Sequence, residues 1–593
     1  MAGANSHSSA AEKARRFLEE EKAFRLGELP TESFHPKTER LSQTAAEDLA
    51  AGIRLLQSVD DDMPPVADAV LGSAVFGELV DCFVRTLAGG GRMFFTGCGA
   101  TGRLSILLEA AWRRFWQNFK AEHPEAAAGV PDLEDRAFSV MAGGDFALIK
   151  SVEGFEDFTD FGRHQLREAG IAAGDMVVAI TEGGETSFVI GTAWEGLDRG
   201  ASVFFVYNNP TDVLREHVER SRRIIEEPRV RTIDLFTGPM AISGSTRMQA
   251  TTIELLIVGA AVEEALVRLL GTYLSEAQLE ALRIPCRGRA EVGALFGALL
   301  EQLSADGAVE HLAALAAFEE DLYRRRGLVT YFADAFMLDV LTDTTERSPT
   351  FMLPPYRRND DRVSPRSWAF ARNPFFGTQE AWRQMLRRTP RGLQWDAEAY
   401  RRIGAPAAIQ ANPPRLDNAE IHKFQIGSEP DASRTAGVDS AAVALAVGGD
   451  AERIFDAMLE YSAGEYGTAA LLTVGERPAG VAADRVFSFE CDLPDSPLAL
   501  WHHLAVKLVL NTISTVTMVR MGRVVGNAMV WVSPSNKKLI DRGCRLIVHV
   551  CGCTYEAACV ALHEAIEEVQ KRIGAGEEAP SPVALAIERF STA

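Results

Sequence analysis

Three short segments of this chain place glycines and hydroxyl side chains where they could bind an anion. They are residues 97–103 (Gly-Cys-Gly-Ala-Thr-Gly-Arg), residues 181–187 (Thr-Glu-Gly-Gly-Glu-Thr-Ser) and residues 243–248 (Ser-Gly-Ser-Thr-Arg-Met). Glycines let the backbone approach a ligand closely, and the free N–H groups at the start of a helix attract a phosphate. The candidate ligand-binding residues in these segments are Gly99, Thr101, Gly102, Arg103, Thr181, Thr186, Ser187, Ser245 and Thr246.

The first segment matches two known phosphate-binding motifs only in part. Gly97, Gly99 and Gly102 have the spacing of a dinucleotide-binding loop, but the next strand ends in Met141 and not in an acidic residue that could bind a ribose. The lysine and the spacing of a P-loop are absent from this segment. Taken singly, each segment is equally compatible with a tight turn or a helix cap that binds nothing. Only their convergence would indicate a site.

Short apolar runs recur along the first half of the chain. We expect strands at residues 92–96, 137–141, 175–180 and 202–206, and helices at 103–116 and 248–270. Continuous apolar strands that alternate with helices indicate a parallel sheet covered on both faces. Because the carboxyl ends of parallel strands lie at one edge of the sheet, the polar segments that follow them should border a common crevice.

A second unit of the same kind follows in the chain. Its expected strands are residues 328–333, 442–446, 469–473 and 485–490, and a long helix is expected at 504–519. The predicted fold class is therefore α/β, with two doubly wound parallel-sheet sandwiches in tandem and a short C-terminal helical segment. The expected parts are an N-terminal extension (1–45), a first domain with the ligand site (46–275), a second domain (276–553) and the C-terminal segment (554–593).

An excursion rich in Pro, Arg and Trp, residues 347–415, interrupts the second unit. Between residues 357 and 391 it holds nine arginines and three acidic residues. We interpret it as a solvated or internally paired loop that covers the second sheet, and a protein-interaction role is the alternative.

Composition narrows the class of protein. The chain has 593 residues and a formal net charge of −21, which argues against nucleic acid or an anionic membrane as the main partner. Eight cysteines are too few for a disulfide framework, and the N-terminus lacks the apolar segment of a signal peptide. We therefore expect a cytoplasmic protein with free thiols, no membrane span, no metal and no cofactor.

Several motifs, taken in order, resemble a known family. They are residues 99–104, 141–145 (Met-Ala-Gly-Gly-Asp), 152–157 (Val-Glu-Gly-Phe-Glu-Asp) and 244–248, followed by 507–515, 522–529 and 535–539 (Ser-Asn-Lys-Lys-Leu). This set is similar to the sugar isomerase (SIS) domains of the N-acetylmuramic acid 6-phosphate etherases and of the glucokinase regulatory proteins. The early segment 26–32 also resembles their N-terminal arm. The resemblance covers most of the chain outside the excursion.

The resemblance implies where a phosphosugar would bind. Thr101 matches a phosphate-binding serine, Glu156 an acid beside the sugar, and Lys507 a lysine that reaches the ligand from the second domain. Glu185 stands where the regulatory proteins have a ligand serine, so Thr186 and Ser187 would replace it. The second unit has no glycine loop after Phe332, which implies one pocket per chain in a monomer that acts as an internal pseudo-dimer.

Two functions remain open from the sequence. The first is a phosphosugar sensor or regulator of carbohydrate metabolism, with a sugar or amino sugar phosphate as ligand and a sugar kinase as one candidate protein partner. The second is an etherase-like lyase or a sugar-phosphate isomerase, in which Glu156 would be the catalytic base. The etherases' other catalytic glutamate falls on Ala111 here, and Glu109 points about 200° around the helix from it. We therefore expect binding without appreciable cleavage of a lactyl ether.

Overall fold

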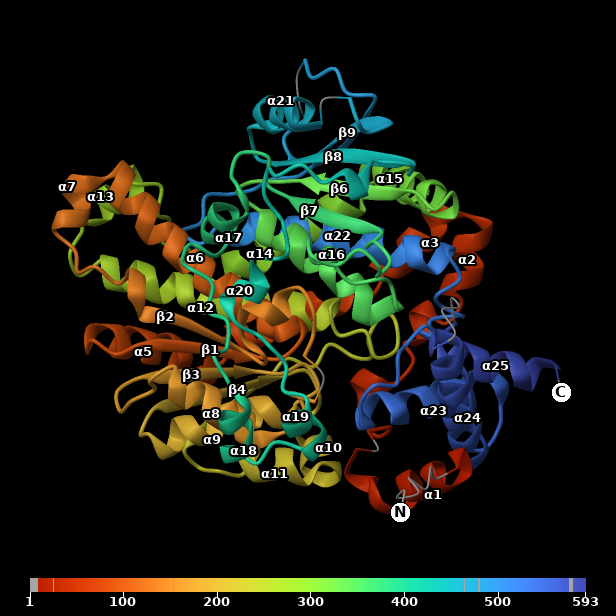
Figure 1. Cartoon of the computed structure of the whole chain (residues 1–593). Coiled ribbons are helices and arrows are strands. Elements are labelled where there is room, and N and C mark those ends of the chain that lie inside the picture. The colour runs from red at the N-terminus through yellow and green to blue at the C-terminus, as the bar shows by residue number, and fades with distance from the viewer. Residues whose placement is uncertain are drawn as a thin grey trace.

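The computed structural model describes residues 9–24, 26–152, 154–462, 464–477, 480–574 and 580–592. Two five-stranded sheets form the body of the molecule, and every named strand pairing in them is parallel (Figure 1). The first sheet has the order β2-β1-β3-β4-β5 and the second the order β10-β9-β8-β6-β7. The chain is thus α/β with two parallel sheets in tandem, as the sequence predicted.

The first sheet confirms four predicted strands and adds one. Its strands are β1 (Met93–Gly97), β2 (Ala137–Met141), β3 (Met176–Ile180), β4 (Ser202–Tyr207) and β5 (Val230–Asp234). β1 and β3 are buried at every position, which explains their unbroken apolar sequence. β5 was missed because it lies at the sheet edge, and exposed Arg231 interrupts its apolar pattern.

Helices cover both faces of the first sheet. Phe95 of β1 packs into one core with α5 (Ala74–Ala88), α6 (Ala100–Glu122) and α12 (Gln249–Leu270). Phe94, the preceding residue, packs into a separate core with α8 (Thr159–Glu168) and α9 (Ser187–Asp198). Successive side chains of a strand point to opposite faces, so these two phenylalanines pack in different cores on the two sides of the sheet.

The second sheet repeats this plan. Its strands are β6 (Leu328–Phe332), β7 (Ala369–Arg372), β8 (Ser440–Val447), β9 (Thr468–Gly475) and β10 (Arg485–Glu490). The sequence analysis missed β7, a four-residue edge strand inside the excursion that is too short for a periodicity signal. The helices around this sheet are α14 (Arg289–Ser304), α15 (Asp306–Arg324), α16 (Met337–Phe351), α21 (Ala451–Ser462) and α22 (Leu500–Arg520).

The two units meet along α12 and α22. Both helices are buried around most of their circumference, as expected from their uniformly apolar sequences. They approach so closely that a Cβ on Gly259 of α12 would lie 2.7 Å from Leu500 Cδ1 of α22. This contact makes the two sheets parts of one packed body.

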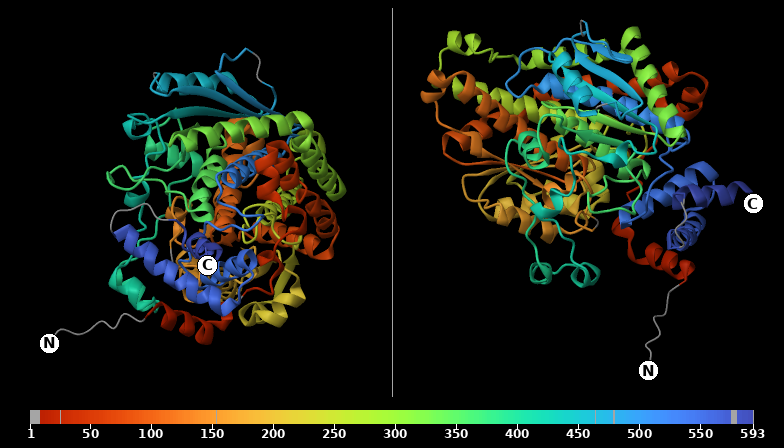
Figure 2. Two further views of the ribbon diagram at one scale, coloured as in Figure 1. Left: turned by 90° about the vertical axis from the view of Figure 1, so that its right-hand side faces the viewer. Right: turned by 45° about the horizontal axis from the view of Figure 1, so that its top comes forward.

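The excursion reaches across to the first unit, contrary to our interpretation of it as a cover for the second sheet. It contains α17 (Thr378–Leu386), α18 (Ala397–Arg402) and α19 (Ala407–Ala411), and α20 (Asn418–Ile421) follows it. These helices run down past β1 and β4 (Figures 1 and 2). Arg388 and Arg391 pair with Glu109 of α6, and Trp395 stacks on Phe155. Its arginines are therefore partly neutralised by acids of the first unit.

The first described helix packs against the C-terminal helical segment. α1 (Ala10–Glu20) packs against α24 (Tyr555–Gly574), which also contacts α23 (Lys537–Cys551) and α25 (Pro582–Thr592) (Figure 1). Buried Glu32 of the N-terminal arm forms ion pairs with Arg542 and Arg545 of α23. The remaining α-helices of the described residues are short: α2 (Leu41–Glu47), α3 (Leu49–Gln57), α4 (Met63–Leu71), α7 (Pro124–Ala128), α10 (Thr211–His217), α11 (Glu219–Ile225) and α13 (Glu276–Ala281).

Within the described ranges, no helix by itself has the length and apolarity needed to cross a membrane. Only α23 and α24 taken together, with a bend of 115° between them, meet those two criteria.

Candidate functional site

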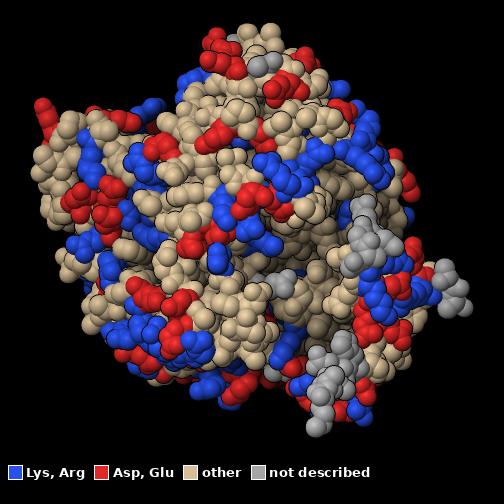
Figure 3. Space-filling model, viewed as in Figure 1, with Lys and Arg blue, Asp and Glu red and all other residues tan. Residues whose placement is uncertain are grey.

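A cleft of about 470 Å³ opens at the carboxyl edge of the first sheet. It is bordered by the start of α6, by the loops around residues 149–156 and 244–247, by the end of α16 and by residues 529–542. Figure 3 shows a hollow on this face, between the main body and the helices α23–α25. Five of the residues predicted from the sequence line it: Gly99, Arg103, Glu156, Ser245 and Thr246.

The glycines of the first loop bring the backbone of α6 to the cleft. Gly99 has φ +59° and precedes α6 without any side-chain cap, so the first N–H groups of the helix remain available. A Cβ on Gly97 would lie 2.4 Å from the carbonyl carbon of Thr101, and one on Gly102 would lie 2.5 Å from Met141 Cγ. Gly97 and Gly102 are therefore required for the turn itself.

Thr101 serves this loop internally. Its Oγ1 accepts a hydrogen bond from the Cys98 N–H at 3.0 Å and donates to the Cys98 carbonyl at 3.0 Å, and the residue is 1% exposed. In this structure the hydroxyl predicted to hold a phosphate thus fixes the turn that presents the helix N-terminus.

The second and third segments lie at different depths. Thr181, Thr186 and Ser187 are buried beneath the cleft, where the Thr181 hydroxyl donates to Thr186 Oγ1 at 3.1 Å. Ser245 and Thr246 line the cleft just before α12, which also lacks a side-chain cap. Two uncapped helix N-termini, those of α6 and α12, therefore face this region.

Lys538, which was not singled out from the sequence, lies between two carboxylates near the cleft. Lys538 Nζ lies 2.5 Å from Glu185 Oε1 and 3.6 Å from Glu156 Oε1. Burial opposes its charge, but the carboxylates of Glu185, Glu156 and Glu32 raise the pKa of Lys538. Its signal in the sequence was the motif at residues 535–539, from which no single residue had been chosen.

Two more carboxyl groups near Lys538, those of Glu182 and Asp157, are strongly desolvated. Burial raises the pKa of Glu182 to about 7, and a hydrogen bond with Thr246 opposes that shift. Burial also raises the pKa of Asp157 to about 6, and the charge of neighbouring Glu156 adds to the effect. Both groups can therefore exchange protons near neutral pH.

The second unit completes the wall of the cleft. Glu346, Ser348, Thr350 and Met352, at the end of α16, all line it. Burial raises the pKa of Glu346, although Arg103 and Arg247 attract its charge. Glu346 was missed by the sequence analysis because nothing in its local sequence ties it to a cleft of the other unit.

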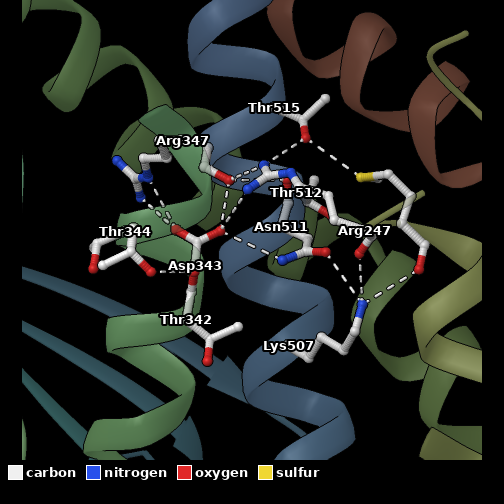
Figure 4. A network of polar contacts seen from close by, with 12 residues as sticks. Arg247, Thr342, Asp343, Thr344, Arg347, Lys507, Asn511, Thr512 and Thr515 are labelled. Atoms are coloured by element: carbon white, nitrogen blue, oxygen red, sulfur yellow. Dashed lines mark hydrogen bonds and ion pairs between the residues drawn. The ribbon is translucent and has the colours of Figure 1, made fainter. Parts of the chain in front are cut away.

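Lys507 lies behind the cleft wall, at the junction of the two units (Figure 4). Its Nζ donates to the carbonyl of Arg247 at 2.8 Å, to Thr252 Oγ1 at 2.9 Å and to Asn511 Oδ1 at 3.2 Å. Burial lowers the pKa of Lys507 to about 8. In this structure Lys507 contacts the chain segment that leads into α12, and its contact with a ligand stays a prediction.

The same junction holds a buried network of charges (Figure 4). Asp343 of α16 accepts hydrogen bonds from Ser514 at 2.7 Å and from Arg347 at 2.9 Å, and it lies 3.4 Å from Arg247 Nη1. Arg347 also pairs with Glu319 at 3.0 Å. Because these groups are withdrawn from water, each charge depends on its partners.

Ala111 and Glu109, the two α6 positions considered for a second catalytic acid, do not line the cleft. Ala111 is 5% exposed and belongs to the core behind α6. Glu109 is fully buried and paired with Arg113, Arg388 and Arg391. Burial alone would raise its pKa, but the three arginines lower the pKa of Glu109 to about 2. As the sequence analysis argued, Glu109 cannot stand in for an acid at position 111.

The arrangement can hold an anion and a polyhydroxylated ligand together. The backbone N–H groups of α6, the hydroxyls of Ser245 and Thr246, and Lys538 can stabilise a phosphate. Glu156 can accept hydrogen bonds from sugar hydroxyls or take a proton from carbon. Within the described residues, no group of His, Cys, Asp and Glu side chains has the geometry to bind a metal ion.

Comparison with known proteins places these segments in a sequence family. Residues 77–194 match the family described as "Glucokinase regulatory protein N-terminal SIS domain". The N-acetylmuramic acid 6-phosphate etherase of Synechococcus sp. (strain CC9902) is 32% identical over 249 residues, which cover 42% of this chain and 69% of that protein. The etherase of Nostoc punctiforme is 30% identical over 247 residues, which cover 42% of this chain and 70% of that protein.

Two solved structures are among those that the chain resembles. The tagatose-6-phosphate ketose/aldose isomerase from Escherichia coli is 9% identical, with a TM-score of 0.41 over 81% of this chain and 94% of that chain. The C-terminal domain of glucosamine-fructose-6-phosphate aminotransferase from Francisella tularensis is 10% identical, with a TM-score of 0.43 over 78% of this chain and 96% of that chain.

Proposed function

This chain is a SIS-domain protein that belongs to the family of the N-acetylmuramic acid 6-phosphate etherases, and on that basis we propose that its cleft binds a phosphorylated sugar or amino sugar. The observation that carries the proposal is the cleft at the carboxyl edge of the first sheet, where the uncapped start of α6 meets Ser245, Thr246 and Glu156. Its volume of about 470 Å³ is within the usual range for small-molecule sites.

We assign the phosphate to the α6 end of the cleft and the sugar ring to the Glu156 end. The helix N-terminus supplies N–H donors and a partial positive charge in a chain whose net charge is −21. Lys538 neutralises the Glu185 and Glu156 carboxylates that would otherwise repel a phosphate. Glu156, 32% exposed at its side chain, remains accessible to a ligand's hydroxyl groups.

We propose that the protein acts as a sensor or regulator of sugar phosphates, binding the ligand without cleaving it. Ala111 offers no carboxyl group, and Glu109 is held by three arginines away from the cleft. The match of residues 77–194 to the glucokinase regulatory protein domain agrees with a binding role.

The second candidate function is a lyase that acts on an ether such as N-acetylmuramic acid 6-phosphate. It is favoured by Glu346, a second carboxyl group in the same cleft that the other unit supplies. Burial raises its pKa, as a proton donor near neutral pH requires. In that reaction Glu156 would take a proton from carbon and Glu346 would protonate the leaving oxygen.

Calorimetric titration with hexose 6-phosphates, fructose 1-phosphate and N-acetylated amino sugar 6-phosphates tests the binding proposal. We expect one of these to bind at one site per chain, and Glu156→Gln to weaken it by about tenfold, since a hydrogen bond to a charged group is worth roughly 1.5–3 kcal/mol. Glu122→Gln, at the far end of α6, is the matched control and should bind normally. Absence of binding by every sugar phosphate would overturn the proposal.

An assay for lactate separates the two candidate functions. Pure protein incubated with N-acetylmuramic acid 6-phosphate should release none above the background rate. Release of lactate that is lost in both Glu156→Gln and Glu346→Gln would establish the lyase and refute the sensor.

A further inference from the structure

The second unit carries a separate pocket lined by arginines. It has a volume of about 370 Å³ and lies between residues 357–370 and residues 425–434. We call it the arginine pocket, after the five guanidinium groups that line it: Arg357, Arg358, Arg362, Arg366 and Arg434. It shares no lining residue with the cleft of the first unit.

Three of these arginines lie on one loop and have no acidic partner. Arg357 donates to the carbonyl of Ser364 at 3.2 Å, and Arg366 donates to the carbonyl of Ser433 at 2.6 Å. Among the residues that the structure describes, exposed Arg362 has no hydrogen-bond or ion-pair partner. None of the three forms an ion pair with a described carboxylate, although Arg357 attracts the nearby charge of Asp361.

Arg434 adds a fourth charge at the base of the pocket. It is 2% exposed and donates to the carbonyls of Ser367 and Val329 at 2.5 and 2.7 Å, and to Thr330 Oγ1 at 3.1 Å. No carboxylate forms an ion pair with it among the described side chains. Burial lowers the pKa of Arg434, and the charge of Asp431 opposes that shift only in part. A buried cation whose hydrogen bonds go to neutral acceptors gains more from an incoming anion than a solvated one does.

The two acids of the pocket lining are occupied in shaping the loops. Asp361 accepts hydrogen bonds from the N–H groups of Val363 and Ser364 at 2.9 and 3.0 Å. Asp431 accepts from the N–H and the hydroxyl of Ser433 at 3.1 and 2.6 Å. Arg358 alone pairs with acids, Glu420 and Asp360, and both lie outside the lining.

The composition of the pocket indicates the class of anion. All of its lining cations are arginines, whose planar fork binds phosphate through two hydrogen bonds at once. The cluster is confined to a small concavity on a chain with a net charge of −21, unlike the extended basic surface of a nucleic-acid-binding protein. The volume is within the range of sites for small molecules.

We propose that the arginine pocket is a second ligand site, which binds a small molecule carrying at least two phosphate groups through Arg357, Arg362, Arg366 and Arg434. This site is independent of the function proposed for the cleft. It gives a role to the arginines of the excursion that form no ion pair with a described acid.

Calorimetry with pyrophosphate tests the proposal on the full chain. We expect one binding event that weakens at least tenfold in the double variant Arg362→Gln/Arg366→Gln, because two charge-assisted hydrogen-bonding groups are lost. Arg383→Gln is the matched control: it lies in the same excursion, is exposed, and pairs with Glu380 outside the pocket. The control should bind pyrophosphate as the unmodified protein does, and thermal unfolding should show both variants folded.

Three outcomes would overturn the proposal. They are no binding at millimolar pyrophosphate, equal affinity in the double variant and the unmodified protein, and equal affinity for pyrophosphate and inorganic phosphate. Binding of heparin in the absence of pyrophosphate binding would also refute it, since that result indicates an extended acidic partner.

Discussion

The two units of this chain use the same corner of the same fold for different purposes. In the first unit, β1 runs through a glycine loop into α6, and the turn leaves the helix N-terminus open to the cleft. In the second unit, β6 runs through residues 333–336 into α16, and no glycine occurs in that turn. The glycines of the first corner let a ligand approach the backbone beside the cleft.

Side chains fill the corner of the second unit. Phe336 stacks on His502 with ring centroids 5.7 Å apart, and the guanidinium of Arg114 lies 5.2 Å from its ring centroid. Asp334 forms an ion pair with Arg453 and accepts a hydrogen bond from Asn373. A carboxylate and an aromatic ring thus occupy the place where the other unit would hold an anion.

The difference shows how a tandem arrangement divides two tasks. The first unit holds the candidate site, while α16 of the second unit supplies acidic members of the buried network at the junction and Glu346 at the cleft wall. Substitutions in each unit test this division.

Asp343→Ala should be the most damaging substitution. It leaves buried Arg247 without its carboxylate partner, and breaking such a pair costs about 3–5 kcal/mol. Urea denaturation measures this loss. Asp321→Ala, which removes an exposed pair with Arg325 on the neighbouring helix α15, should change stability by less than about 1 kcal/mol. Similar losses for both would show that the junction does not depend on α16.

The buried carboxyl group of Glu182, in the first unit, should make the free energy of unfolding depend on pH. The pKa of Glu182 is raised to about 7, above the value of 4.5 in the unfolded chain. The folded state therefore retains a proton that the unfolded state loses, and stability falls as the pH rises from about 4.5 to 7. Glu182→Gln should remove on the order of 3 kcal/mol from that fall.

Unfolding curves recorded between pH 4.5 and 7.5 provide the check for Glu182. Glu310→Gln, an exposed position on α15, should leave the pH profile unchanged. Parallel profiles for Glu182→Gln and the unmodified protein would contradict the assignment.

Gly97→Ala should separate the two corners. The added Cβ meets the backbone of Thr101 at 2.4 Å, and such overpacking costs roughly 1–3 kcal/mol. It also displaces the start of α6, so sugar phosphate affinity should fall more than about tenfold. Ala333→Gly, after the matching strand of the second unit, should leave that affinity unchanged. Equal losses from both would mean that the second corner also contributes to binding.

Substitutions of two hydroxyl residues, Ser245 and Thr101, should have the smallest effects on sugar phosphate affinity. Ser245 lines the cleft, so Ser245→Ala should weaken sugar phosphate binding by about fivefold, the value of one hydrogen bond of about 1 kcal/mol. Thr101→Val removes the internal bonds to Cys98, so it should lower the unfolding temperature and affect affinity less. Asp334→Asn should not change affinity. A larger loss of affinity in Thr101→Val than in Ser245→Ala would restore Thr101 as a direct ligand.

The tandem α/β fold could be predicted from the sequence alone, and the same motifs pointed to the region of the candidate site. The buried strands β1 and β3 have short apolar sequences, and these runs predict where each strand lies and how long it is. The loss of the glycine loop after β6 was equally readable and predicted a single pocket. The short edge strands β5 and β7 were not readable, because edge positions and four-residue strands leave little pattern.

Which polar groups line the candidate cleft could be read only from the tertiary structure. Thr101 and Ser245 are both hydroxyl residues at helix starts, yet one is turned into its own loop and the other lines the cleft. Glu346 and Lys538 come from segments far along the chain, and burial near other charges sets their protonation. Motifs record backbone requirements within a few residues, whereas the direction and ionisation of a side chain depend on neighbours that folding brings together.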